Sequence, residues 1–148
     1  MALYSVANRT TSGTTATAAE EVIAGSTVEH KIFELGLSLV AATASTYGFG
    51  RPGATGVTPT SPINLLAEDG GNTSGSTAGT SQAETAIAWG TGPTVPANFA
   101  RRASLPATVG AGLIWTFPRG FITLKTLSTV LWNLATNSVA DCWVVVDE

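Results

Sequence analysis

The chain has 148 residues, a net charge of −3 and only 11% charged residues, whereas an average soluble domain has about 25%. Its 44% apolar content predicts a folded domain with a core rather than a disordered chain. Two lysines and five arginines are too few to hold a phosphate backbone, so we expect no nucleic acid partner. The low charge favours a surface that protein partners cover in part.

The single cysteine and the absence of targeting or membrane-spanning patterns restrict the class of protein further. A single cysteine, Cys142, excludes an intrachain disulfide and a multi-cysteine zinc site. Beside Asp141 and Trp143 it is expected to be a small buried apolar residue rather than a reactive thiol. The sequence carries no pattern of a signal peptide and no apolar run long enough for a membrane span, so we expect no membrane partner.

Strand patterns dominate the first part of the chain. The residues around Leu3 and Val6 predict a short first strand, and residues 16–23 are interpreted as strand or extended chain rather than as helical turns. Residues 31–42 give a clearer pattern, because apolar side chains alternate with polar or small ones at the period of a half-buried strand. The alternating residues are Phe33, Leu35, Leu37 and Leu39.

Residues 48–96 have a different character and predict a long excursion from the sheet. A Gly/Ser/Thr tract at 69–82 cannot pack a core by itself, and loops of this length are usually functional or disordered. The apolar islands at 61–69 and 84–90 predict short strands or anchors that tie the excursion down. Five of the seven prolines lie in the excursion: Pro52, Pro59, Pro62, Pro93 and Pro96.

Short strands return after Ala97, and turn signals separate them. The expected strands are 99–105, 112–117, 121–124, 127–134 and 141–146. Pro118-Arg119-Gly120 predicts a turn or strand corner with Arg119 at its tip, and residues 136–138 predict another turn. This spacing without strand–helix alternation predicts an all-β sandwich or barrel in one domain, residues 1–148.

Three of these strands, 112–117, 127–134 and 141–146, are apolar on both faces. A strand of a simple two-layer sandwich shows one polar face, so this pattern predicts a second covering layer. Either the excursion folds back over the sheet or a neighbouring subunit supplies the cover.

No catalytic template finds its residues in this chain. The single histidine, His30, is interpreted as a solvated loop residue rather than a catalytic base or metal ligand. Adjacent carboxylates such as Glu20-Glu21 point to opposite faces of a strand and form no catalytic dyad. We therefore expect no enzyme activity, no cofactor and no metal.

The basic pair Arg101-Arg102 is the one cluster of positive charge in the sequence. In a strand, one arginine would point outward and the other inward, where it would need a carboxylate partner. A structural salt bridge is the preferred interpretation for this pair.

The sequence also resembles small accessory virion proteins of tailed bacteriophages, of the capsid decoration or cement type. The resemblance lies in "GRPGATGVTPTSP" (50–62), "AIAWGTGPTVP" (86–96), "RRASLPATVGAGLIWTFPRG" (101–120) and "LWNLATN" (131–137). It implies a jelly-roll-like antiparallel β-sandwich with a long Pro/Gly-rich excursion, and a homotrimer on the capsid surface. It further implies a major capsid protein as partner, capsid subunits clamped together, and synthesis in the host cytoplasm.

Six residues are predicted to contact other subunits or the capsid. They are Trp89, Phe99, Arg101, Arg102, Arg119 and Trp132. The alternative function is a host-adhesion or carbohydrate-binding module of a phage head or tail appendage, in which tryptophans stack on sugars. Packing in the core or in an interface is the preferred interpretation of those tryptophans, which are Trp89, Trp115, Trp132 and Trp143.

Overall fold

The computed structural model describes residues 3–10, 17–23, 29–54, 57–59, 62–63, 65–68, 82–85, 89–123, 128–135 and 138–147. All regular structure in this part of the chain is β-strand. None of it forms a helix long and apolar enough to cross a membrane. The Gly/Ser/Thr tract at 69–81, the end of the strand expected at 121–124 and most of the turn expected at 136–138 lie outside the described residues.

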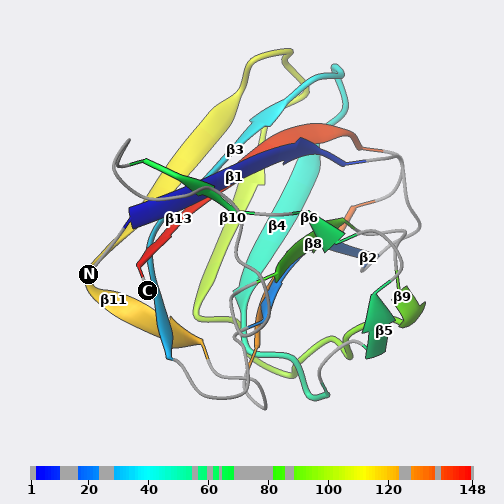
Figure 1. Ribbon diagram of the computed structural model, residues 1–148. Coiled ribbons are helices and arrows are strands. Elements are labelled where there is room, and N and C mark those ends of the chain that lie inside the picture. Colours follow the sequence, from blue (N-terminus) through cyan, green and yellow to red (C-terminus); the bar gives the residue numbers. More distant parts are fainter. Residues whose placement is uncertain are drawn as a thin grey trace.

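Eight longer strands build two facing sheets (Figure 1). In chain order they are β1 (Leu3–Arg9), β2 (Thr17–Ile23), β3 (His30–Leu39), β4 (Ser45–Gly50), β10 (Arg101–Leu105), β11 (Gly112–Thr123), β12 (Thr129–Asn133) and β13 (Ala140–Asp147). One sheet has the order β11-β3-β13-β1, and the other has the order β10-β4-β12-β2.

The pairing of these eight strands is that of a jelly roll. β1 pairs with β13, β2 with β12, β3 with β11 and β4 with β10, all antiparallel. The first strand thus lies beside the last and the second beside the second last, as in a long hairpin that is wrapped into two sheets. The prediction of an all-β, jelly-roll-like antiparallel β-sandwich is confirmed.

The excursion supplies five short strands, and three of them extend the two sheets. These five are β5 (Val57–Pro59), β6 (Pro62–Ile63), β7 (Leu66–Ala67), β8 (Gln82–Thr85) and β9 (Trp89–Thr91). β7 adds to β1, β8 adds to β2 and β6 adds to β8, while β5 and β9 form a separate ribbon. The apolar island at 61–69 therefore supplies two short strands of the sheets, β6 and β7, as predicted. The island at 84–90 holds the end of β8 and the start of β9, and its residues 86–88 lie outside the described residues. β7 and β8 lie beside β1 and β2. They cover the two edge strands of one side of the sandwich, which is a common protection against edge pairing.

β4 is a strand that the sequence analysis missed. The expected excursion began at residue 48, but Ser45–Gly50 is an inner strand between β10 and β12. Its glycines concealed the pattern, although Tyr47 and Phe49 are buried in the core between the sheets. The glycines have a packing role, because a Cβ on Gly48 would lie 2.7 Å from the ring of Phe99.

β11 runs through both predicted strands, 112–117 and 121–124. Of the turn or strand corner that was expected between them, the turn is absent and a bend within one strand is present. β11 is one strand along a single neighbour, β3, and its register shifts between Thr116 and Phe121. Residues 117–120 stand opposite one residue of β3, so Pro118-Arg119-Gly120 is the centre of a bulge. A hairpin turn would instead have placed residues 121–124 beside residues 112–117, as a separate neighbouring strand.

β3 carries its own irregularity at Phe33. Its pairing with β13 shifts between Ile32 and Glu34, so Ile32 joins the buried face and Phe33 leaves it. The expected alternation of Phe33 with Leu35, Leu37 and Leu39 was therefore wrong at its first member. The other three leucines are buried as predicted.

The expected cover over the doubly apolar strands is present for β12. Leu131 joins the main core, while Val130 and Trp132 form a second cluster on the opposite face with Phe99 and Leu134. The cover therefore comes from the same chain, just after the excursion. β11 has no comparable cover, since Ile114 on its outer face is 55% exposed.

Candidate interaction surface

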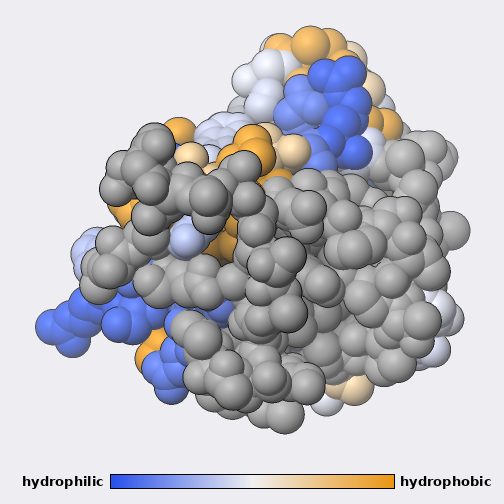
Figure 2. Space-filling model, in the orientation of Figure 1, coloured by the Kyte–Doolittle hydropathy of each residue, from blue (hydrophilic) through white to orange (hydrophobic). Residues whose placement is uncertain are grey.

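Four of the five arginines gather at the side of the sandwich formed by β10 and β11, opposite the edge strands that β7 and β8 extend. We call Arg51, Arg101, Arg102 and Arg119 the arginine edge. Arg101 and Arg102 lie on β10, Arg119 lies on the bulge of β11, and Arg51 directly follows β4. Hydrophilic side chains project from the molecule beside the C-terminal half of β11 (Figure 2).

An aromatic cluster holds two of these arginines. Phe49 lies 5.2 Å from Phe117 and 5.1 Å from Phe121, between ring centroids, at the end of the core. The guanidinium of Arg51 lies 4.9 Å from the centroid of Phe121, and that of Arg101 lies 5.5 Å from the centroid of Phe117. Cation–π contact with fixed rings restrains both side chains before any partner arrives.

Arg51 is the more firmly held of the two. Its Nη2 donates a hydrogen bond to the carbonyl oxygen of Ile122 at 2.7 Å, which ties the end of β4 to the end of β11. Partial burial lowers the pKa of the Arg51 guanidinium below its usual value. The sequence analysis did not select Arg51, although it is one of only five arginines in a chain of low charge.

The structural salt bridge expected for the inward arginine of the pair Arg101-Arg102 is absent within the described part of the chain, and both side chains are exposed. β10 is the edge strand of its sheet, so a long side chain on its inner face reaches solvent around the margin. Arg101 donates from Nη1 to the carbonyl oxygen of Ala100 at 2.9 Å, so no buried carboxylate partner is needed.

Three arginines of the edge have no ion pair within the described part of the chain. There, no carboxylate pairs with Arg101, Arg102 or Arg119. Arg9, in contrast, lies elsewhere on the molecule and holds Asp141, with 2.6 Å between Nε and Oδ1. Exposed and restrained guanidinium groups are suited to bind carboxylates of a partner.

The apolar contact candidates lie apart from these arginines. Phe99 is half-buried and packs on Trp132, which is fully buried in its own chain. A partner would therefore meet Phe99 before Trp132. Trp89 lies in the β5–β9 ribbon, and its side chain is outside the described residues. The contact roles of these three residues remain predictions.

Two of the groups considered for chemistry, His30 and Cys142, lie inside the fold. His30 is fully buried at the start of β3, so its interpretation as a solvated loop residue was wrong. Its Nδ1 lies 3.2 Å from the carbonyl oxygen of Asp147. Cys142 is buried, as expected for a small apolar residue. No group of three or more His, Cys, Asp or Glu residues suited to hold a metal occurs within the described ranges.

Comparison with known proteins gives little further information. No protein-family model matches the chain, and no curated protein matches it. Among solved structures, the coat protein of Tobacco streak virus has a weak likeness over 97% of this chain and 86% of that chain, with 12% identity and a TM-score of 0.28. A likeness of this size does not indicate a shared function.

Proposed function

We propose that this chain is a structural protein of a bacteriophage virion, which decorates the capsid surface and stabilises it by clamping neighbouring capsid subunits. Its jelly-roll strand order supports this proposal, because viral capsid domains often use that fold. Lectins and cupins also use it, so the fold alone does not determine the function.

The arginine edge is the observation that carries the proposal. Arg101 and Arg51 are restrained on aromatic rings, and Arg102 and Arg119 are exposed close by in a chain with only 11% charged residues. Such a surface recognises an acidic protein face at a small entropic cost, since the guanidinium positions are partly fixed beforehand. The partner is the major capsid protein, and binding needs no reaction, cofactor or metal.

The chain acts as a homo-oligomer made in the host cytoplasm and carried on the virion, and the resemblance to phage decoration proteins implies three copies. Apolar side chains that reach the surface, such as Ile114 at 55% exposure, favour self-association.

Binding to particles tests this function. Particles assembled without the chain are mixed with the purified chain, and the bound fraction is measured by co-sedimentation over a range of salt concentrations. We expect saturable binding that weakens with salt and a rise in the temperature at which the particle breaks. Replacing Arg101, Arg102 and Arg119 together by glutamine should weaken binding at least about tenfold. Arg9→Gln is the matched control and should bind as the wild type does.

Two outcomes would overturn the proposal. One is the absence of binding to the particles, and the other is unchanged affinity of the triple arginine variant. The alternative, a host-adhesion or carbohydrate-binding module, requires accessible aromatic rings. Trp132 is fully buried, and Trp115 packs 6.3 Å from Phe49 within the core cluster. A glycan array with strong hits, together with no particle binding, would favour that alternative.

A further inference from the structure

The outer face of the five-stranded sheet carries an apolar surface. None of the six predicted contact residues belongs to it. Four of the large apolar side chains with high exposure lie on strands of this sheet: Leu3 at 41%, Leu66 at 60%, Ile114 at 55% and Ile122 at 39%. Half-buried Trp143 and Val145 lie between them. We call the face formed by Leu3, Leu66, Ile114, Trp143 and Val145 the outer face.

The strand register shows that these residues form neighbouring rows on one surface. One row runs from Leu66 through Ser5, Val145 and Glu34 to Thr116, across all five strands. The next row runs Ala7, Trp143, Gly36, Ile114. The alternate positions, which include Val6, Val144 and Leu35, are buried in the core. An antiparallel sheet that is buried on one side usually has a polar opposite face in contact with water. The large apolar side chains that stand among polar ones in these rows, such as Leu66, Val145 and Ile114, therefore favour a partner.

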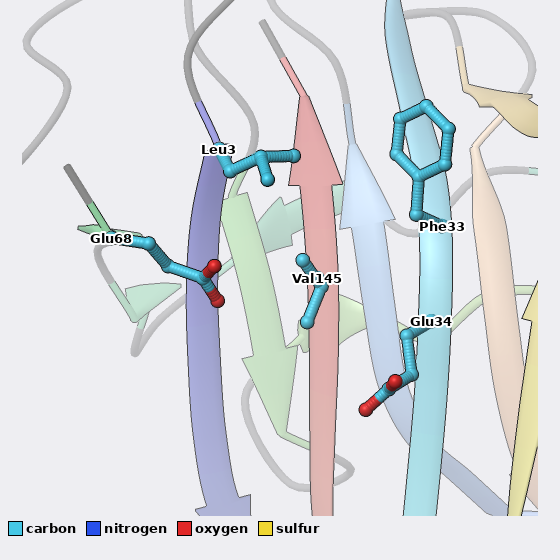
Figure 3. A pocket seen from close by; sticks show the side chains of 5 residues that line it. All are labelled: Leu3, Phe33, Glu34, Glu68 and Val145. Atoms are coloured by element: carbon cyan, nitrogen blue, oxygen red, sulfur yellow. The ribbon is translucent and has the colours of Figure 1, made fainter.

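The outer face also contains a depression. It encloses about 740 Å³ and is lined by Leu3, Phe33, Glu34, Glu68 and Val145. Figure 3 shows the carboxylates of Glu34 and Glu68 pointing toward β13 from its two sides. The bulge in β3 creates this feature, because it turns Phe33 away from the core.

Trp143 is held in place before any partner binds. Its indole lies over Gly36, where any Cβ would overlap the ring, and its Nε1 donates to Oε1 of Glu34 at 2.8 Å. A fixed tryptophan offers a large contact area and loses little side-chain freedom on association.

The charges at the two margins of the outer face are opposite. Glu68 is exposed directly after β7, on one margin. Arg119 is exposed on the bulge of β11, on the other margin, and Lys31 lies beside that bulge, since a Cβ on Gly120 would lie 2.6 Å from the Lys31 side chain. A two-fold axis parallel to the strands would place the β7 margin of one copy against the β11 margin of the other. The face is then complementary to itself in charge as well as apolar in its centre.

We propose that a second copy of this chain covers the outer face, packed face to face about such a two-fold axis. Glu68 of each copy meets Arg119 of the other copy, and Ile114, Trp143 and Val145 are buried between them. This inference rests on the self-association in the proposed function, and it replaces the three copies implied by resemblance with two. Two-fold contacts of this kind are the commonest in soluble oligomers.

Mass measurement by light scattering and sedimentation at micromolar concentration tests the contact. We expect twice the chain mass of 15.0 kDa for the wild type. Ile114→Lys places a charge on the β11 side of the outer face, where the proposed contact buries Ile114, and should raise the dimer Kd at least about tenfold. Val109→Lys is the matched control, because Val109 is 62% exposed in the turn between β10 and β11, and it should leave the Kd unchanged.

A charge exchange tests the proposed geometry. Glu68→Arg and Arg119→Glu should each weaken the dimer, and the double variant should restore it, because the two positions meet across the axis. A wild-type monomer, a trimer, or a dimer unaffected by Ile114→Lys would overturn the inference, as would a double variant weaker than both single ones. Co-sedimentation with particles is measured separately on Ile114→Lys. Intact particle binding by monomeric Ile114→Lys leaves the capsid role standing. Lost binding of a dimeric double variant, Arg101→Gln with Arg102→Gln, which keeps Arg119, affects only the arginine edge.

Discussion

The ring of Phe99 meets the indole of Trp132 edge-on, with 5.7 Å between ring centroids and 67° between ring planes. Trp132 stands opposite Gly48 in the pairing of β12 with β4, and Phe99 occupies the space that a side chain on Gly48 would take. One ring thus fastens the segment before β10 to the outside of the six-stranded sheet. This contact also sets the path by which Arg101 and Arg102 reach the edge of the molecule.

Truncation of this ring should destabilise the fold. We expect Phe99→Ala to lower the free energy of unfolding by about 2 kcal/mol, below the ~3–5 kcal/mol typical of a fully buried phenylalanine, because Phe99 is half-buried. Urea titration followed by tryptophan fluorescence measures the change. Phe99→Leu retains most of the apolar volume and should lose clearly less.

Gly48→Ala should also destabilise the chain, by about 1–3 kcal/mol, because the new Cβ would lie 2.7 Å from the Phe99 ring. The two changes should not add. In Phe99→Ala the ring is gone, so Gly48→Ala should then cost little. Additive losses in the double variant would show that the two residues do not compete for this space.

Gly36→Ala tests the packing of the Trp143 indole against Gly36 on the outer face. The Cβ would overlap the indole, so the ring must move and the hydrogen bond to Glu34 must lengthen or break. We expect a loss of about 1–3 kcal/mol and a shifted Trp143 emission, measured in a chain whose other tryptophans are replaced by phenylalanine. Gly92→Ala is the control, since no atom lies within 4 Å of its Cβ position, and it should leave both readings unchanged.

The bulge of β11 should depend on its glycine. Gly120 has φ of +71°, and a Cβ there would lie 2.6 Å from Lys31, so Gly120→Ala combines backbone strain with a side-chain clash. Gly110 has φ of +81° with open space around it, so Gly110→Ala brings only the strain of about 1 kcal/mol. In thermal unfolding, Gly120→Ala should lower Tm more than Gly110→Ala. Equal shifts would contradict the role of the Lys31 contact.

The Arg9–Asp141 pair gives a pH dependence of known sign. The hydrogen bond from Arg9, followed by its charge, lowers the pKa of Asp141 below its usual value of 3.8. Because the folded pKa lies below the unfolded one, the pair stabilises the fold above the unfolded pKa, and this stabilisation disappears as pH falls through the folded pKa. The effect is small, since the side chains are 63% and 44% exposed.

Asp141→Asn should therefore lower Tm slightly at neutral pH, and the difference from the wild type should vanish below the lowered pKa. Added salt should reduce the difference at neutral pH as well. A Tm difference that persists in strong acid would mean that Asp141 acts through packing rather than through its charge.

Part of the candidate site was visible in the sequence. Arg101, Arg102 and Arg119 stood out because charge is scarce in this chain, and all three are exposed. Arg51 did not stand out, because its importance comes from Phe121, which follows it by 70 positions in the chain. The outer face was also missed as a unit, since its rows combine residues from five strands.

The sequence by itself determined where most strands lie, because runs of apolar residues between turn signals favour strands, and in β3 they also alternate with polar or small residues. It also determined the all-β class and the doubly apolar character of β12. These are local properties, because each of them depends on only about ten consecutive residues.

Only the tertiary structure decided which strands are neighbours and where the register shifts. Periodicity cannot show that the bulge of β11 stands opposite Phe33, that Gly48 and Gly50 belong to an inner strand, or that His30 is buried. Those facts depend on pairing between residues far apart in the chain. Long-range pairing sets which side chains fill the core and which reach the edge, where the arginines and the apolar outer face lie.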